Sequence, residues 1–474
     1  MLKNKGRSSL TEGPIFTRML AFVIPIIITG VLQVMYNMAD NIVVGQFSGD
    51  PNALGAVGST SSLTALITNI MISISSGAGV VIAQFYGAKD HDKVSRTVHT
   101  AMTFSVVGGI VLMILGIVFA RPLLTLMGTK DAFYDKAVLY VTIICCGIPA
   151  SSIYNFGAAT LRSIGDSKSS LYILAASGLV NVLLNLFFVL VCRMTVDGVA
   201  YATIISQYIS AIAVVCILMA RRGESYHLNF RKLRMELPLI ARILRIGIPM
   251  ALQSSLFSIS NIIITGSVNT FPEHVVSAKT IAFNIEGITY TVMNAFANAA
   301  ITFVGQNYGA QKYRRINKVF LYALMQVIIA GILVSQIEIL FARELSSLYI
   351  NEADPDKEKI IQAVLEIFNI MLTTYFLCGT MEVISGVLKA LGFSISSVVA
   401  SLIGLVSRVG WIVLVTRIER FHTIFWLFVS YTISWIFTIL LLLGCCAYAW
   451  KKLDIMKRAR EEKMKEKTKQ GEYI

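Results

Sequence analysis

One acidic side chain, Asp40, lies inside an otherwise apolar run near the start of the sequence, about seven residues from its outer end. At a rise of about 1.5 Å per helical residue this depth is about 10 Å, too far for a two-carbon side chain to reach water. Ionisable groups at such depth are costly in hydrocarbon, so they are functional candidates by default. A desolvated carboxylate takes up a proton readily or demands a cation. Asp40 is therefore either a coupling residue or a structural acid satisfied by neighbouring Asn or Ser side chains.

The elements that must hold such a side chain are membrane helices. Of the 474 residues, 55% are hydrophobic and 14% are charged, whereas about a quarter of a soluble domain is charged. Apolar runs long enough to cross a hydrocarbon core about 30 Å thick recur along the chain. No segment alternates with period two, so helices are predicted and not a barrel. We predict twelve spans, at about residues 19–46, 55–83, 97–120, 137–160, 169–191, 198–220, 239–267, 276–304, 318–341, 361–388, 396–416 and 423–450.

The net charge of +14 would suggest nucleic acid in a soluble protein, but here it follows a membrane topology. With both termini placed in the cytoplasm, 30 of the 41 Lys and Arg residues fall on the inner side, as the positive-inside rule requires. We therefore expect a multi-pass protein of the inner (plasma) membrane, with the lipid bilayer as a partner and no nucleic acid. The polar start has no signal-peptide core, so the first span is expected to be retained.

The chain is duplicated. The segment Ile82–Arg96, IAQFYGAKDHDKVSR, returns as Val304–Lys318, VGQNYGAQKYRRINK, and each copy follows a long apolar run. Since each copy contains six spans, an even number, the two copies enter the membrane facing the same way and form parallel repeats. We predict an amino-terminal six-helix lobe over residues 1–220, a cytoplasmic linker over 221–245, a carboxy-terminal lobe over 246–450 and a basic cytoplasmic tail over 451–474. Membrane duplications of this size are typical of transporters.

Six short motifs occur in order along these spans, and together they resemble the multidrug and toxic compound extrusion (MATE) family. The resemblance runs from about Thr11 to Trp450, and it implies a V-shaped pair of six-helix lobes, alternating access, and export of amphipathic compounds driven by inward flow of protons or sodium. We expect no cofactor and a monomer. The motifs are Asp40-x4-Gly45, Ala53-Leu54-x2-Val57-Gly58, Gln84-x-Tyr86-Gly87-Ala88, Leu161-Arg162-x2-Gly165-Asp166-Ser167, Gly198-Val199-Ala200-x-Ala202-Thr203 and Gly305-Gln306-Asn307-Tyr308-Gly309-Ala310.

Three polar residues resemble the family cluster that faces this aspartate: Asn181, Asn185 and Thr203. The two asparagines stand one helical turn apart on one face. The family often has Asn-x3-Asp here, so this chain keeps one carboxylate where many relatives have two. That departure favours protons over sodium as the coupling ion, although asparagine carbonyls can still complete a sodium shell. Interhelical hydrogen bonding is the alternative role of the asparagines.

Further ionisable residues lie in the second copy of the repeat. Glu286, near the middle of its span, resembles an acid common in this branch of the family and is a candidate to hold a cationic substrate or a second proton. An ion pair with Lys279 is the alternative. Glu382 is a candidate for an inner gate, or a structural partner for Arg408, because an unpaired arginine at that depth is costly. Methionine repacks around varied shapes and aromatic faces attract cations, so we predict substrate contacts at Glu286, Tyr36, Asn155 and Met293.

These features predict a secondary active antiporter for amphipathic, mainly cationic, drugs or toxic compounds. The first rival is a lipid-linked saccharide flippase of the same superfamily, which would need a cluster of cationic side chains for pyrophosphate, whereas the spans offer Lys279 and Arg408. The second rival is a membrane enzyme. The seven cysteines and five histidines show no catalytic or metal-ligand spacing, so no enzyme activity is expected.

Overall fold

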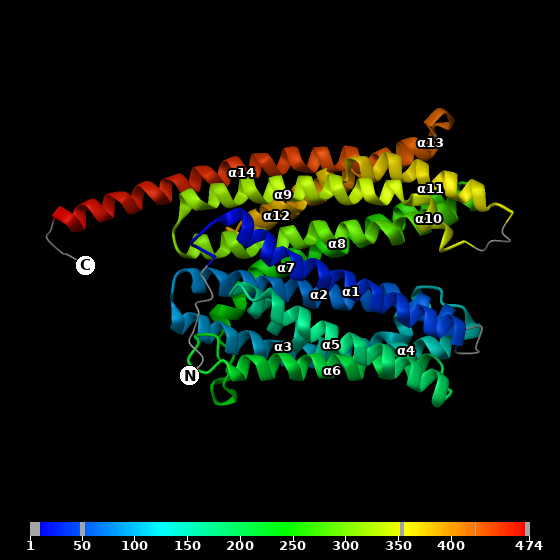
Figure 1. The fold of residues 1–474 in the computed structure, drawn as a ribbon, viewed down its shortest axis with the longest axis horizontal. Coiled ribbons are helices and arrows are strands. Elements are labelled where there is room, and N and C mark those ends of the chain that lie inside the picture. The colour runs from blue at the N-terminus through cyan, green and yellow to red at the C-terminus, as the bar shows by residue number, and fades with distance from the viewer. Residues whose placement is uncertain (1–9, 48–52, 351–354, 422, 470–474) are drawn as a thin grey trace. The chain divides into compact units, whose positions relative to one another are not determined.

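A computed structural model describes residues 10–47, 53–350, 355–421 and 423–469, and all regular secondary structure in them is helical (Figure 1). The all-α fold class is thus confirmed. The α-helices are α1 (Ile15–Phe47), α2 (Ala53–Gly87), α3 (His91–Leu126), α4 (Tyr134–Ser163), α5 (Ser167–Leu186), α6 (Val196–Ala220), α7 (Leu237–Val268), α8 (Glu273–Gly309), α9 (Tyr313–Leu340), α10 (Ala342–Ser347), α11 (Lys357–Met371), α12 (Tyr375–Ala390), α13 (Ser394–Arg417) and α14 (Ile424–Lys469). Short 3-10 or π segments are η1 (Asp131–Phe133), η2 (Phe187–Val191), η3 (Phe230–Lys232), η4 (Leu372–Thr374) and η5 (Glu419–Phe421).

Eleven stretches of the described chain are helical, long and apolar enough to cross a membrane. They coincide with eleven of the twelve predicted spans, and the predicted span 361–388 is built from α11, η4 and α12. The remaining predicted span, 276–304, lies within α8, which at 37 residues is long enough but more polar. Lys279, Glu286 and three asparagines, Asn284, Asn294 and Asn298, contribute to that polarity. The basic residues before Leu10 and residues 351–354 lie outside the described residues.

The chain forms two compact units. The first comprises residues 17–255 and holds most of α1, all of α2 to α6 and the first part of α7. The second comprises residues 10–16 and 256–469 and holds the rest of α7 together with α8 to α14. Two helices, α1 and α7, therefore begin in one unit and continue in the other.

The duplication is also visible in the backbone of the turns. Lys89, after α2, has a left-handed φ of 57°, and its counterpart Gln311, after α8, has a φ of 55°. The same holds for Gly165 at 95° and Gly392 at 90°, which stand between helices in the two copies. Such values are uncommon outside glycine, so the two Q-x-Y-G-A segments share one specific turn.

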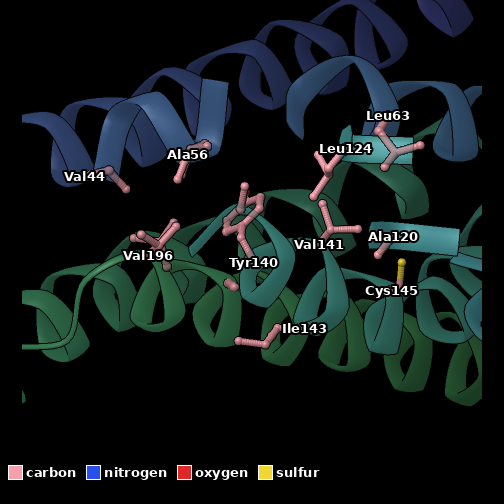
Figure 2. Close-up of a cluster of buried hydrophobic side chains, with 14 of the residues drawn as sticks. Val44, Ala56, Leu63, Ala120, Leu124, Tyr140, Val141, Ile143, Cys145 and Val196 are labelled. Atoms are coloured by element: carbon pink, nitrogen blue, oxygen red, sulfur yellow. The ribbon is translucent and has the colours of Figure 1, made fainter. Parts of the chain in front are cut away.

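A buried apolar cluster holds the part of the first unit next to Asp40 (Figure 2). Tyr140 of α4 lies at its centre, and α1 contributes Val43 and Val44, the residues that follow Asp40 by one turn. Leu124 of α3 and Val196 of α6 also belong to the cluster. Between membrane helices such packing stabilises through van der Waals contact and not through removal of apolar surface from water. These contacts hold the part of α1 that follows Asp40 against its neighbours.

Candidate functional site

A small polar cavity of about 170 Å³ surrounds Asp40 within the first unit. Five helices, α1, α2, α4, α5 and α6, each contribute side chains. The lining residues are Gln33, Tyr36, Asn37, Asp40, Thr68, Ile72, Ser151, Tyr154, Asn155, Leu174, Ser177, Gly178, Asn181, Thr203, Ser206, Gln207 and Ser210. Asp40 is the one acid among them, and none of these described residues is cationic.

The Asp40 carboxylate contacts the polar residues that the sequence singles out. Asn185, which is fully buried on α5, donates from Nδ2 to Asp40 Oδ1. The same Nδ2 lies 3.4 Å from Asn181 Oδ1, one turn away on α5. Thr203 of α6 lies beside the carboxylate, and its hydroxyl also donates to the Val199 carbonyl at 2.9 Å. The structure thus brings together all four residues of the predicted coupling site.

Two of the predicted substrate contacts lie in this same cavity. Tyr36 of α1 donates to the Ala175 carbonyl at 3.3 Å, and its ring lies directly over Gly178 of α5. Gly178 leaves the room that this ring needs, because a Cβ there would lie 1.8 Å from Tyr36 Cε2. Asn155 of α4 donates from Nδ2 to the Ser151 carbonyl at 2.8 Å. Tyr36 therefore packs against the helix that carries the two asparagines.

The size of the cavity limits what it can hold. Sites for drug-sized ligands occupy about 300–1,000 Å³, whereas this cavity measures about 170 Å³. A water molecule takes up about 30 Å³ in the liquid, so the space suits a few waters, a proton or a small monovalent ion. A carboxylate with amide and hydroxyl neighbours and no basic partner can exchange a proton or coordinate such an ion.

The other two predicted contacts lie in the second unit. Glu286 of α8 accepts a hydrogen bond from the Tyr375 hydroxyl at the start of α12. Met293, two turns later on α8, is fully buried, and its sulfur fills the space above Gly331 of α9 and Gly379 of α12. Glu286 is thus a carboxyl group beside the aromatic side chain of Tyr375, and Met293 packs between α8, α9 and α12.

Two expected ion pairs of the second unit are absent from the described residues. Lys279 does not pair with Glu286, since it donates to Thr265 Oγ1 at 2.8 Å and lies 4.8 Å from the ring centre of Phe283. Arg408, which is 3% exposed, stacks 4.2 Å from the ring centre of Tyr431. The expected pairing of Arg408 with Glu382 is therefore wrong. The Tyr431 ring faces the guanidinium instead, and Glu286 lies within electrostatic reach of it.

A third buried acid of the second unit was missed by the sequence reasoning. Glu338 of α9 is 5% exposed, and neither carboxylate oxygen makes a hydrogen bond of ordinary geometry in the described part of the chain, although Thr289 of α8 lies beside it. It lies within electrostatic reach of Glu286. An acid inside the apolar run 318–341 was the signal that could have indicated it. No group of three or more His, Cys, Asp or Glu side chains among the described residues could hold a metal ion.

A helical membrane protein with a repeated six-span unit and a carboxylate in an ion-sized polar cavity belongs to the class of membrane transporters. The profile of the MatE family matches residues 25–187 and 249–414. Because the match covers more than half of the chain, the protein belongs to the MatE family. Family membership also identifies the chain as a transporter.

Relatives of known description agree with this class. A probable multidrug resistance protein of Bacillus subtilis, YoeA, is 27% identical over 456 residues, which cover 93% of this chain and 95% of that protein. A FAD transporter of Shewanella oneidensis is 23% identical over 352 residues, which cover 73% of this chain and 76% of that protein. Among solved structures, a MATE protein in complex with MaL6 superposes with a TM-score of 0.86 at 20% identity, covering 95% of this chain and 98% of that one. That likeness confirms the fold.

Proposed function

We propose that the protein is a proton-driven antiporter that exports amphipathic, mainly cationic, compounds by alternating access, with Asp40 as the coupling residue. One observation carries the proposal: the cavity is too small for a drug, and among the described residues that line it Asp40 is the one acid and none is cationic. Relatives named as multidrug resistance and multidrug export proteins support the direction of transport.

The coupling follows from a change of charge in a desolvated place. Ionised, the carboxylate accepts the Asn185 amide, which stabilises the charge. Protonated, it loses that charge and part of the hydrogen-bond strength. A ligand shifts a conformational equilibrium only through its differential affinity for the two states, so one conformation of the first unit must bind the proton more tightly.

The orientation of the asparagines supports protons over sodium. Asn185 Nδ2 points its N–H groups at Asp40 Oδ1 and towards Asn181 Oδ1. A sodium ion binds several oxygen atoms and would need Asp40 Oδ1 and Asn181 Oδ1 as ligands. Here both oxygens face the N–H groups of Asn185 instead. A proton needs one carboxylate oxygen only.

Substrate recognition is proposed for the second unit. Glu286 offers a carboxylate next to Tyr375, whose ring lies 5.2 Å from that of Trp435. Carboxylate and aromatic faces both attract organic cations. We assign Tyr36 and Asn155 to the ion cavity and Met293 to packing, which leaves Glu286 as the proposed contact for the substrate's cationic group.

The proposed arrangement in the membrane follows the positive-inside rule. Both termini and the linker 221–245 lie in the cytoplasm, residues 1–220 and 246–450 are the two moving lobes, and the basic tail 451–474 lies at the lipid surface. The membrane is the inner (plasma) membrane, and the protein acts as a monomer.

Flux through purified protein in liposomes tests the function. Ethidium, a second amphipathic cation and FAD are loaded separately, and an inward proton or sodium gradient is imposed. We expect efflux of at least one cation with the proton gradient, and increased sodium dependence in Asn185→Asp, which restores an acid pair. Gradient-independent leakage of every compound would contradict the proposal, and efflux of FAD alone would redirect it to anionic substrates.

A further inference from the structure

A second pattern repeats immediately before the first helix of each half. Glu12-x-Pro14-x3-Arg18 precedes and enters α1, and Glu236-x-Pro238-x3-Arg242 precedes and enters α7. All three positions recur with the same offset of 224 residues, as do Pro25 and Pro249 inside the two helices. The two halves therefore begin with one common segment, which we call the leader. We use the name for residues 10–16 in the first copy and for residues 234–242 in the second, a range whose last residue, Arg242, corresponds to Arg18 of the first copy.

The first leader docks on the second Q-x-Y-G-A turn, and both lie in the second unit. The Leu10 amide donates to Gln306 Oε1 at 3.2 Å, and Asn307 Nδ2 donates to the Leu10 carbonyl at 3.4 Å. Gln306 and Asn307 are both fully buried. These contacts hold the main chain of the leader, and the Leu10 side chain is buried as well.

The basic residues after this turn hold the rest of the first leader. Lys312 Nζ donates to the Thr11 carbonyl at 3.1 Å and lies 3.6 Å from the Glu12 carboxylate. Arg315 donates to the carbonyls of Glu12 and Gly13 at 3.0 and 2.8 Å. Gly13 has a φ of 69°, which few other residues adopt. Two cations thus satisfy three consecutive carbonyls just before α1 begins.

The second leader docks on the first turn within the first unit, through side-chain contacts. Arg242 donates to Gln84 Oε1 at 2.7 Å and stacks 4.6 Å from the ring centre of Phe85. Glu236 accepts two hydrogen bonds at 3.0 Å from Nε of Arg96. Gln84 and Gln306 are equivalent in the repeat, and so are Glu12 and Glu236. In both copies the turn glutamine accepts from the leader, and the leader glutamate pairs with a basic residue that follows the turn.

We infer that the Q-x-Y-G-A turns are docking sites for the leaders, and that Gln306, Lys312 and Arg315 are positioning residues for α1, the helix that carries Asp40. The docked leader belongs to the second unit, whereas the part of α1 that carries Asp40 belongs to the first. The helix between them is continuous over about 25 residues, or about 38 Å. A shift of α1 at the ion cavity is therefore transmitted to the docked leader.

Thiol labelling tests the docking directly. Thr11 is 4% exposed when docked, so Thr11→Cys, in a chain whose seven native cysteines are replaced, should react slowly with a hydrophilic maleimide. Arg315→Met removes two charged hydrogen bonds, and labelling should become about tenfold faster. Arg314→Met is the matched control, since this neighbouring arginine is exposed and should leave the rate unchanged. Equal labelling rates in all three backgrounds would overturn the inference.

The consequence for transport rests on the proposed function and needs a second readout. We expect labelling of Thr11→Cys to change at least about threefold when a proton gradient is imposed, and Asp40→Asn to remove that response. A gradient response that persists in Asp40→Asn would show that the leader does not respond to Asp40. If Arg315→Met accelerates labelling while Asp40→Asn still exports dye, the docking stands and the proposed coupling fails. If labelling is unchanged in Arg315→Met while Asp40→Asn exports no dye, the docking fails and the proposed coupling stands.

Discussion

A close approach of two helices in the first unit gives a quantitative prediction. A Cβ added to Gly77 of α2 would lie 2.8 Å from the Gly247 amide nitrogen and 2.8 Å from the Ile243 carbonyl oxygen of α7. Ordinary contacts to carbon need about 3.5 Å, so α7 would have to move by about 0.7 Å. Both obstacles are backbone atoms, and no side chain can rotate away. Gly77→Ala should therefore carry an overpacking cost of about 1–3 kcal/mol.

Gly58→Ala provides the matched control on the same helix. Nothing lies within 4 Å of the added Cβ, and alanine favours a helix over glycine by about 1 kcal/mol. Because Gly77→Ala gains the same helical term, the difference between the two variants isolates the packing cost. Reversible unfolding of purified protein in mixed detergent micelles measures it. Equal unfolding free energies for the two variants would refute the close packing of α7 on α2.

The remaining predictions concern the ion cavity, the topology and one surface ion pair. Gly178→Ala should displace the Tyr36 ring into the cavity and slow dye efflux by at least about tenfold at normal expression; unchanged efflux would separate Tyr36 from the mechanism. A cysteine at Ser225 should resist an impermeant thiol reagent in intact cells while one at Lys357 reacts, and the opposite pattern would invert the topology. Hydrogen bonds from Arg96 lower the pKa of Glu236, so its stabilising contribution is complete above the free glutamate pKa of about 4.3 and is lost as pH falls from there through the lower folded-state pKa. Thermal stability of wild type and Glu236→Gln should accordingly differ by a constant amount between about pH 6 and 8 and converge in acid.

Much of the fold could be predicted from the sequence because lipid imposes a simple rule. Each span must satisfy its backbone internally, so apolar length indicates a helix almost directly. The eighth span is more polar, but it could be predicted because it corresponds to the second span in the repeat. The break at η4 was not predicted, since Leu372–Thr374 contains no proline or glycine that would mark it.

The candidate site was partly predictable for a similar reason. Asp40 stands out because an isolated acid in hydrocarbon is costly, and Asn181 and Asn185 stand out by their spacing of one turn. The environment of Arg408 was not predictable, since sequence favours an acid as its partner, whereas the structure supplies the Tyr431 ring. The leaders were overlooked because their signal is three residues spread over seven positions. Their role becomes visible only when the docked turns show what the repeated glutamate and arginine contact.

Proton flux through Asp40→Asn measures the proposed coupling most directly. Wild type and variant are reconstituted at equal density, an inward pH gradient is imposed, and dye efflux and proton uptake are recorded together in the same vesicles. We predict that wild type moves protons with dye, and that Asp40→Asn, nearly isosteric and cheaper to bury, inserts normally but shows neither gradient-driven efflux nor dye-coupled proton uptake. Efflux by Asp40→Asn at the wild-type rate, with the same response to the pH gradient, would contradict the role of Asp40 and leave Glu286 as the next candidate.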